Sequence, residues 1–252
     1  MDDQACIIGG LGVVGSNTAR LFGIKKIFDL NGSTITLEQA AKCKFCFIAL
    51  PTNVKEDGTY DTSDIETTIR QIEGYGGAGI YILRCTVWPG YARSLMDSLG
   101  IDRIVSNPEF LSEKTAWQDT KSPPFILLGG QAARHLEDVK GIYEARVKGA
   151  NVILTDNTTA EMAKLAMNAY FSVKIIFANE LYDNCQRLGG NYEKVREILE
   201  RHPYGPRNHF EIYYKGRRGI HGKCLPKDTK AFIHYVGGEI VKTAYEKNST
   251  IQ

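Results

Sequence analysis

The chain has 252 residues, with 31 lysines and arginines against 29 aspartates and glutamates, which gives a formal net charge of +2. This balance argues against a nucleic-acid or anionic-lipid partner, because both are bound through an excess of positive charge. No apolar run approaches the ~20 residues of a membrane-spanning helix, and the acidic N-terminus is unlike a signal peptide. Six scattered cysteines are typical of reduced thiols, so we expect a soluble cytoplasmic protein without nucleic-acid or membrane partners.

Short apolar segments alternate with helical patterns up to about residue 156. The segments are apolar on both faces and bounded by glycine, proline, asparagine or aspartate, as buried parallel strands are. Helical stretches such as 62–72 and 133–143 lie between them, so residues 1–156 are predicted to form an α/β domain with a doubly wound parallel sheet. The predicted strands are 5–8, 26–29, 45–50, 80–85, 103–106, 125–128 and 152–154.

After residue 156 the pattern becomes helical. One long helix is predicted over 158–188, where no glycine or proline occurs, and shorter helices over 192–201 and 229–235. Residues 157–252 are therefore predicted to form a small second domain built on a long central helix.

A glycine-rich turn follows the first predicted strand and opens a helix. Its spacing is G-x-G-x-x-G, which lets the backbone approach a pyrophosphate at the helix N-terminus. Asp29 ends the second strand, where a carboxylate accepts hydrogen bonds from ribose hydroxyls and repels a 2′-phosphate. The alternatives are glycines that only shape a turn, or NADP held near Lys25 and Lys26, but the context favours NAD. The expected cofactor-binding residues here are Gly10, Leu11, Gly12, Val13, Val14, Gly15 and Asp29.

Three polar residues interrupt an otherwise apolar stretch of the long helix. Glu161, Lys164 and Asn168 fall at i, i+3 and i+7 and so form one stripe. A helix that is apolar nearly all round is buried, and a buried lysine is frequently catalytic. The alternative is that Glu161 and Lys164 pair on a solvated face.

Cys224 lies in a glycine-containing loop beside Lys223 and Lys227. A thiol in an accessible, electropositive loop is a candidate nucleophile. Cys43 and Cys46 form a C-x-x-C pair without a second pair, so structural packing is favoured over zinc or redox chemistry. The five histidines show no ligand spacing, and we expect no metal site.

Several motifs occur in a fixed order along the chain. They are residues 51–52 (PT) with 57–63 (DGTYDTS), 85–90 (CTVWPG), 107–111 (NPEFL) with Glu113, the polar helix from Ala160, and 222–228 (GKCLPKD). In this order they resemble the UDP-glucose/GDP-mannose dehydrogenase family. The resemblance implies a Rossmann-type NAD-binding domain, a long central helix and a helical dimerisation domain.

The resemblance also implies a reaction, the four-electron oxidation of a sugar-nucleotide C6 alcohol to a carboxylate with NAD. Cys224 would form a thiohemiacetal and then a thioester. In this family's manner Lys164 and Asn168 would stabilise oxyanions, Asp228 and Thr86 would hold the catalytic water, and Glu109 would be the base in thioester hydrolysis.

Further contacts follow from the same resemblance. The cofactor would also contact Pro51, Thr52, Thr86 and Glu113. The substrate would contact Glu109, Phe110, Leu111, Lys164, Asn168 and Gly222. The helix over 158–188 would pair with its copy in a homodimer.

The sequence departs from the family in length. Family members carry a further nucleotide-binding domain after the central region, so the resemblance implies a shortened member. Two alternatives therefore stay open. One is a two-electron dehydrogenase like the β-hydroxyacid dehydrogenases, which also have a Lys-x-x-x-Asn helix but do not use a cysteine. The other is a non-catalytic NAD-binding protein that pairs with a full-length partner.

Overall fold

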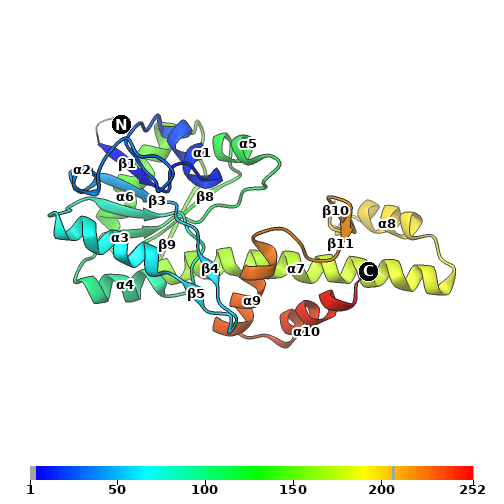
Figure 1. Ribbon diagram of the computed structural model, residues 1–252. Helices are drawn as coiled ribbons and strands as arrows, with labels where there is room; N and C mark the ends of the chain where they lie inside the picture. Colours follow the sequence, from blue (N-terminus) through cyan, green and yellow to red (C-terminus); the bar gives the residue numbers. More distant parts are fainter. Residues whose placement is uncertain (1–3, 206–207, 252) are drawn as a thin grey trace. The chain divides into compact units, whose positions relative to one another are not determined.

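The computed structural model describes residues 4–205 and 208–251. By their internal contacts these residues divide into two compact units (Figure 1). The first unit holds the chain up to Asn53 and the segment Tyr60–Lys164, and the second holds Val54–Thr59 and the chain from Leu165 onward.

The first unit is built on a seven-stranded sheet with the strand order β2-β1-β3-β6-β7-β8-β9. The order reverses beside β1, which is the doubly wound arrangement that the alternating pattern predicts. This confirms the predicted α/β fold class. The strands are β1 (Ala5–Ile8), β2 (Ile27–Phe28), β3 (Phe45–Ile48), β6 (Ile80–Leu83), β7 (Ile104–Ser106), β8 (Ile126–Gly129) and β9 (Val152–Thr155).

The prediction that the sheet is parallel throughout is wrong at one pair. β8 runs antiparallel to β7, with Ser106 opposite Gly129, whereas β8 and β9 are parallel. A parallel pair needs a crossover connection, usually a helix packed on the sheet. Here the connecting segment carries only the short helix α5 (Ala116–Lys121), which contacts α1 (Val13–Phe22).

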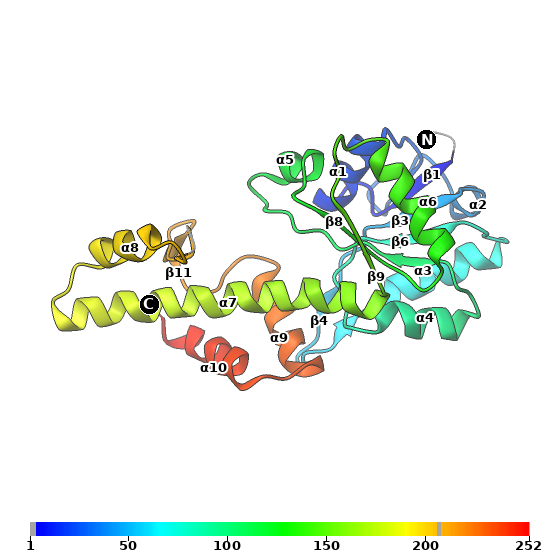
Figure 2. The ribbon, with the colours of Figure 1, turned by 180° about the vertical axis from the view of Figure 1, so that it is seen from behind.

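Helices cover both faces of the sheet (Figure 2). One face packs against α1 and α6 around a cluster that includes Phe22, Phe47 and Tyr143. The opposite face packs against α2, α3 and α4, with Ile69 and Leu95 among its buried residues. The bounds are α2 (Leu37–Ala41), α3 (Ser63–Gly74), α4 (Tyr91–Leu99) and α6 (Ala133–Glu144).

The long helix predicted over 158–188 is α7 (Asn157–Leu188). Asp156 caps it, because its carboxylate accepts hydrogen bonds from the backbone N–H and hydroxyl of Thr159. The two units divide at Lys164, beyond residue 156 where the sequence pattern changes. The reason is that the first turns of α7 pack on the sheet.

The rest of α7 organises the second unit. Its Cys185 packs with Tyr192 and Ile212, and its Ile176 packs with Ile220 and Ala244. The other elements of the chain are the hairpin strands β4 (Asn53–Val54), β5 (Tyr60–Asp61), β10 (Tyr213–Tyr214) and β11 (Arg217–Arg218), and the helices α8 (Tyr192–Arg201), α9 (Leu225–Tyr235) and α10 (Glu239–Lys247), followed by a 3₁₀ turn (Asn248–Thr250).

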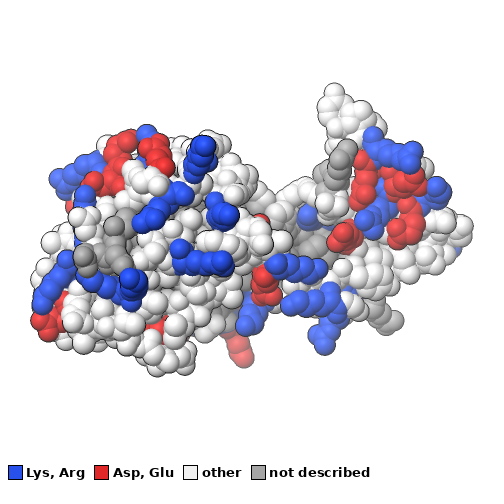
Figure 3. Space-filling view, turned by 90° about the horizontal axis from the view of Figure 1, so that it is seen from above, with Lys and Arg blue, Asp and Glu red and all other residues white. Residues whose placement is uncertain are grey.

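Charges of both signs share the surface of α8. Its Glu197 pairs with Lys194 at 2.8 Å and with Arg201 at 2.5 Å, and Arg196 pairs with Glu200 at 3.2 Å. Figure 3 shows positive and negative side chains interleaved in this region. Such exposed pairs at i, i+3 and i, i+4 each stabilise a helix only slightly. No helix within the described residues is both long and apolar enough to cross a membrane.

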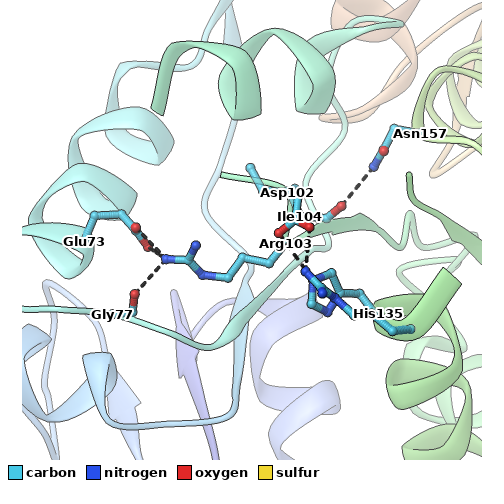
Figure 4. Close-up of polar contacts among 8 residues, drawn as sticks. Glu73, Gly77, Asp102, Arg103, Ile104, His135 and Asn157 are labelled. Atoms are coloured by element: carbon cyan, nitrogen blue, oxygen red, sulfur yellow. Dashed lines mark hydrogen bonds and ion pairs between the residues drawn. The ribbon is translucent and has the colours of Figure 1, made fainter. Parts of the chain in front are cut away.

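A largely buried ion pair joins Arg103, the residue before β7, to Glu73 of α3. The Arg103 Nη2 donates to both carboxylate oxygens of Glu73, at 2.6 and 2.5 Å, and to the Gly77 carbonyl at 2.7 Å (Figure 4). The two side chains are 18% and 22% exposed. On the surface nearby, Asp102 pairs with Arg134 at 2.6 Å, and there both side chains are more than half exposed.

We predict that Arg103→Met lowers the free energy of unfolding by about 2–3 kcal/mol, because it leaves the Glu73 carboxylate desolvated without its cation. Urea denaturation measures the loss. Arg134→Met is the matched control, and it should cost less than about 0.5 kcal/mol. Equal losses in the two variants would contradict the assigned role of the Arg103 pair.

Candidate active site

The glycine-rich turn has two structural glycines and one that the fold does not require. A Cβ at Gly15 would overlap the Gly9 carbonyl oxygen, and one at Gly10 would lie 2.6 Å from Ile27 Cγ2. At Gly12 a Cβ would meet only the Gly9 carbonyl oxygen, at 3.7 Å. Since packing does not demand glycine at this position, its absent side chain leaves the backbone open to a ligand.

The N-terminus of α1 fits a pyrophosphate. Gly12 is its N-cap, so no side chain caps the helix, and the first turn holds no acidic residue. The first backbone N–H groups therefore face outward with the positive end of the helix dipole, which is a site for an anion. The flanking Leu11 and Val13 are about half exposed, as residues beside a bound nucleotide would be before it binds.

Asp29 lies beside this turn. Its Oδ1 accepts a hydrogen bond from the Asn31 backbone and its Oδ2 one from the Leu11 backbone, both at 3.0 Å. These bonds lower the pKa of the carboxyl group, so it is ionised at neutral pH. A fixed carboxylate next to the glycine turn suits the ribose hydroxyls of NAD.

The other predicted cofactor contacts lie on loops of the first unit. Thr52 is buried and donates to the Thr86 carbonyl at 2.7 Å, which holds the loops after β3 and β6 together. Pro51 is exposed beside it, and Glu113 is exposed in the segment before α5.

All three polar residues of the α7 stripe are buried: Glu161 is 3% exposed and Lys164 and Asn168 are each 5% exposed. The alternative of a solvated Glu161–Lys164 pair is therefore wrong. Instead the three side chains have partners on other elements.

Glu161 caps the N-terminus of α4. Its carboxylate accepts hydrogen bonds from the backbone of Gly90 at 2.7 Å and of Ala92 at 3.0 Å, and from the Ser106 hydroxyl at 2.9 Å. Burial raises the pKa of Glu161 to about 7 against the lowering effect of these donors. The Asn157 Nδ2 donates to the same Ser106 hydroxyl and to the Ile104 and Gly129 carbonyls, so the start of α7 is bound to β7 and β8.

Lys164 pairs with Glu109. Their charged atoms lie 3.3 Å apart and the side chains are only 7% and 13% exposed. The second oxygen of Glu109 accepts from the Leu111 backbone at 2.6 Å, and the Lys164 ammonium lies 5.3 Å from the centre of the Phe110 ring. A small cavity adjoins the pair, lined by Leu83, Cys85, Thr86, Val87, Ser106, Pro108, Glu161 and Lys164.

The second unit holds the other predicted catalytic residues. Asn168 donates to the Asp228 carboxylate at 2.7 Å, and Asp228 is only 1% exposed. Lys227 pairs with the other oxygen of the same carboxylate at 2.5 Å. Cys224 is exposed and immediately precedes α9, and its carbonyl accepts from the Asp228 backbone at 2.9 Å. A helix N-terminus favours a thiolate.

Each unit thus brings together part of the predicted set. Thr86, Glu109, Phe110, Leu111 and Lys164 gather in the first unit. Asn168, Gly222, Cys224 and Asp228 belong to the second, where Gly222 is exposed at a φ of 89° in the loop before Cys224.

Sequence reasoning missed Ser106 altogether, and it named Lys227 only for its charge beside Cys224, not as the partner of Asp228. Ser106 ends an apolar strand, and Lys227 neighbours an aspartate in a half-apolar helix. Each was visible as a polar residue next to buried ones, but its partner was not. Among the described residues no cluster of three or more histidines, cysteines or acids could hold a metal ion.

The doubly wound sheet, the open glycine turn and the ionised Asp29 define a dinucleotide-binding protein. Two models of one family match the chain. The NAD binding domain of the UDP-glucose/GDP-mannose dehydrogenase family matches residues 23–147, and the central domain of the same family matches residues 158–249.

Known proteins show the same likeness. UDP-glucose 6-dehydrogenase of Rickettsia felis is 29% identical over 80% of this chain and 47% of its own length. The structure of a UDP-glucose dehydrogenase from Pyrobaculum islandicum is 25% identical with a TM-score of 0.84, covering 99% of this chain and 68% of that one. Mycobacterium tuberculosis 3-hydroxyisobutyrate dehydrogenase shares the fold at 16% identity and a TM-score of 0.76, covering 99% and 94%.

The chain belongs to the UDP-glucose/GDP-mannose dehydrogenase family. The match to the NAD binding domain confirms the expected cofactor, NAD. The chain spans about half the length of the curated relatives it matches.

We predict that Glu161 makes stability depend on pH. Its pKa in the folded chain is about 7, above the ordinary 4.5, so the folded state binds the proton more tightly than the unfolded state. The stabilisation is complete below pH 4.5 and is lost as the pH rises through about 7, by up to roughly 3 kcal/mol.

Urea denaturation across this range measures the effect. Glu161→Gln should flatten the decline, because the neutral amide does not titrate. Glu38→Gln, which changes an exposed carboxyl group, should leave the slope unchanged. Parallel curves for the wild type and Glu161→Gln would refute the prediction.

Proposed function

We propose that this chain is an NAD-dependent dehydrogenase that oxidises the C6 alcohol of a sugar nucleotide, similar to UDP-glucose, to the carboxylate. The observation that carries the proposal is the stripe on α7. Lys164 and Asn168, four residues apart, are both buried and each contacts a carboxylate, Glu109 or Asp228. Burying such charged and polar groups costs desolvation free energy that their pairing at best repays, so stability alone does not account for their presence on α7.

The NAD-binding part of the proposal rests on the first unit. The N–H groups at the start of α1 would hold the pyrophosphate and Asp29 would hold the adenosine ribose. When bound there, NAD would supply the hydride acceptor for each of two oxidation steps.

The protein groups handle protons and the developing oxyanions. In the first oxidation the alcohol loses a proton and a hydride and becomes an aldehyde. The Cys224 sulfur adds to the carbonyl carbon, and the oxygen becomes an alkoxide that the Lys164 ammonium and the Asn168 amide stabilise. A proton on that oxygen gives the thiohemiacetal.

In the second oxidation the thiohemiacetal loses a proton and a hydride and becomes a thioester on Cys224. Water held by Asp228 and Thr86 then attacks the thioester carbon, Glu109 takes the proton from the water, and the sulfur leaves as thiolate. The sum is one alcohol, two NAD⁺ and one water giving one carboxylate, two NADH and three protons.

A second candidate is a two-electron dehydrogenase of the β-hydroxyacid type. It is favoured by the 3-hydroxyisobutyrate dehydrogenase structure, of which this chain covers 94%. That reaction has no use for Cys224. A third candidate is a non-catalytic NAD-binding protein that pairs with a full-length partner. The location we propose is the cytoplasm, since all six cysteines are thiols.

We predict two NADH per substrate consumed. A panel of sugar nucleotides followed by NADH absorbance measures the ratio. Cys224→Ser should abolish formation of the carboxylate, by about 10³-fold or more, because the hydroxyl is a far weaker nucleophile than a thiolate.

The control is Cys185→Ala, a buried cysteine of the same unit, which should keep the ratio of two. One NADH per substrate with an unaffected Cys224→Ser variant would support the two-electron reaction. NAD binding without turnover of any substrate would support the non-catalytic reading.

We also propose a homodimer formed through α7. Met167, Tyr170 and Phe177 are 36%, 48% and 56% exposed and recur at a spacing of three to seven residues, as in a helix-pairing seam. Phe177→Asp should therefore give a monomer at micromolar concentration in sedimentation. Ile240→Asp, which changes an even more exposed apolar residue of α10, should leave the dimer intact. A wild-type monomer would disprove the assembly.

A further inference from the structure

Arg84 is a buried cation of the first unit that the proposed reaction does not use. It follows β6 and is only 8% exposed. Its Nη1 donates to the Asn107 carbonyl at 3.2 Å, to the Asn107 Oδ1 at 2.7 Å and to the Tyr143 hydroxyl at 3.2 Å. Within the described part of the chain all of these acceptors are neutral oxygens, and the buried Nε has no acceptor.

A guanidinium is charged at every accessible pH, and burying it against neutral groups destabilises a fold relative to an apolar side chain of similar size. Packing alone therefore does not account for Arg84. Its charged hydrogen bonds instead order Asn107.

Asn107 is fixed from several directions and is 1% exposed. Its backbone N–H donates to the Leu83 carbonyl at 2.8 Å, and its Nδ2 donates to the Leu127 carbonyl at 2.9 Å. Its Oδ1 accepts from Arg84 and from the Tyr143 hydroxyl, the latter at 2.5 Å. These bonds tie Asn107 to β6, β8 and α6 at the point where the chain leaves the sheet.

The Tyr143 hydroxyl needs its proton for this arrangement, because it donates to Asn107 while accepting from Arg84. Burial raises the pKa of Tyr143, although the charge of Arg84 acts in the opposite direction. The phenol therefore stays a donor throughout the physiological range.

Glu109 lies two residues beyond this fixed point. Pro108 between them is buried and has a restricted φ, so few torsions separate Asn107 from Glu109. The position of Asn107 consequently limits where the Glu109 carboxylate lies against the Lys164 ammonium, 3.3 Å away.

We propose that Arg84 and Tyr143 are positioning residues, which hold Asn107 and through it set the Glu109 carboxylate against Lys164. The catalytic meaning of this contact rests on the function proposed above for Glu109. The mechanical coupling between Tyr143 and Glu109 does not depend on that function, and it can be tested without turnover.

A double-mutant cycle on the full chain tests the coupling. Glu109→Gln is measured by urea denaturation in the wild type and in Tyr143→Phe, which keeps the ring and removes the hydroxyl. If Tyr143 positions Glu109, the effect of Glu109→Gln on the unfolding equilibrium constant is at least about threefold smaller in the Tyr143→Phe background.

Tyr81→Phe is the matched control. Tyr81 is 1% exposed and its hydroxyl donates to Glu73 at 2.5 Å, so this variant also loses one buried hydroxyl bond in the same unit. The effects of Tyr81→Phe and Glu109→Gln on the free energy of unfolding should add, so that the unfolding equilibrium constant of the double variant agrees with the additive value within about twofold. If Tyr143→Phe is equally additive, the proposal is overturned. Should Tyr143→Phe fail to fold, Arg84→Lys, which keeps the charge and loses the planar donor set, enters the same cycle.

A kinetic measurement then gives the consequence. With a sugar nucleotide that is turned over, Tyr143→Phe should slow release of the acid from Cys224 about tenfold and leave KM for NAD within about twofold, because a misplaced base affects only hydrolysis. An unchanged hydrolysis rate overturns the positioning role. Coupling in the cycle without turnover of any sugar nucleotide supports the positioning of Glu109 and overturns only the proposed function.

Discussion

The desolvated contact between the Lys164 ammonium and the Glu109 carboxylate is the constraint on which the first unit's site depends. Neither charge can be buried alone without a cost of several kcal/mol, so the two must meet. Lys164 reaches the pair from α7, and Glu109 reaches it from the segment that leaves the sheet after β7. The pair therefore fixes the relation between a helix and a loop that are far apart in the sequence.

The start of α7 has to be docked firmly for that contact to form. Asn157 bonds to the carbonyls of Ile104 and Gly129, and Glu161 bonds to the N-terminus of α4. The Ser106 hydroxyl joins the two by accepting from Asn157 and donating to Glu161. One face of a helix thus binds the ends of several elements through the Nδ2 of Asn157, the Ser106 hydroxyl and the Glu161 carboxylate, and such a hydrogen-bonded polar cluster makes a core rigid. It also explains why the contacts place this part of α7 with the sheet.

The antiparallel direction of β8 also contributes to the position of the Lys164–Glu109 pair. A parallel crossover would carry the chain after β7 to the other end of the sheet. In the observed topology the segment from Asn107 to the start of β8 stays at the end of the sheet where β7 ends. There Pro108 lines the cavity, and Glu109 forms the ion pair with Lys164. This geometry explains how the buried polar groups of the first unit are kept in place.

The sequence by itself determined the features that depend on local pattern: the alternating elements of the sheet domain, the unbroken helix α7, the open glycine at Gly12 and the stripe of Glu161, Lys164 and Asn168. The periodicity of apolar residues and the conformational freedom of glycine act over a few residues, so they can be recognised in the sequence without knowledge of the tertiary structure. Only the tertiary structure decided the direction of β8, the separate partners of the stripe, and the bonds that join Arg84 and Tyr143 to Asn107. Each of these depends on which groups, tens of residues apart, become neighbours once water is excluded, and no local pattern carries that information.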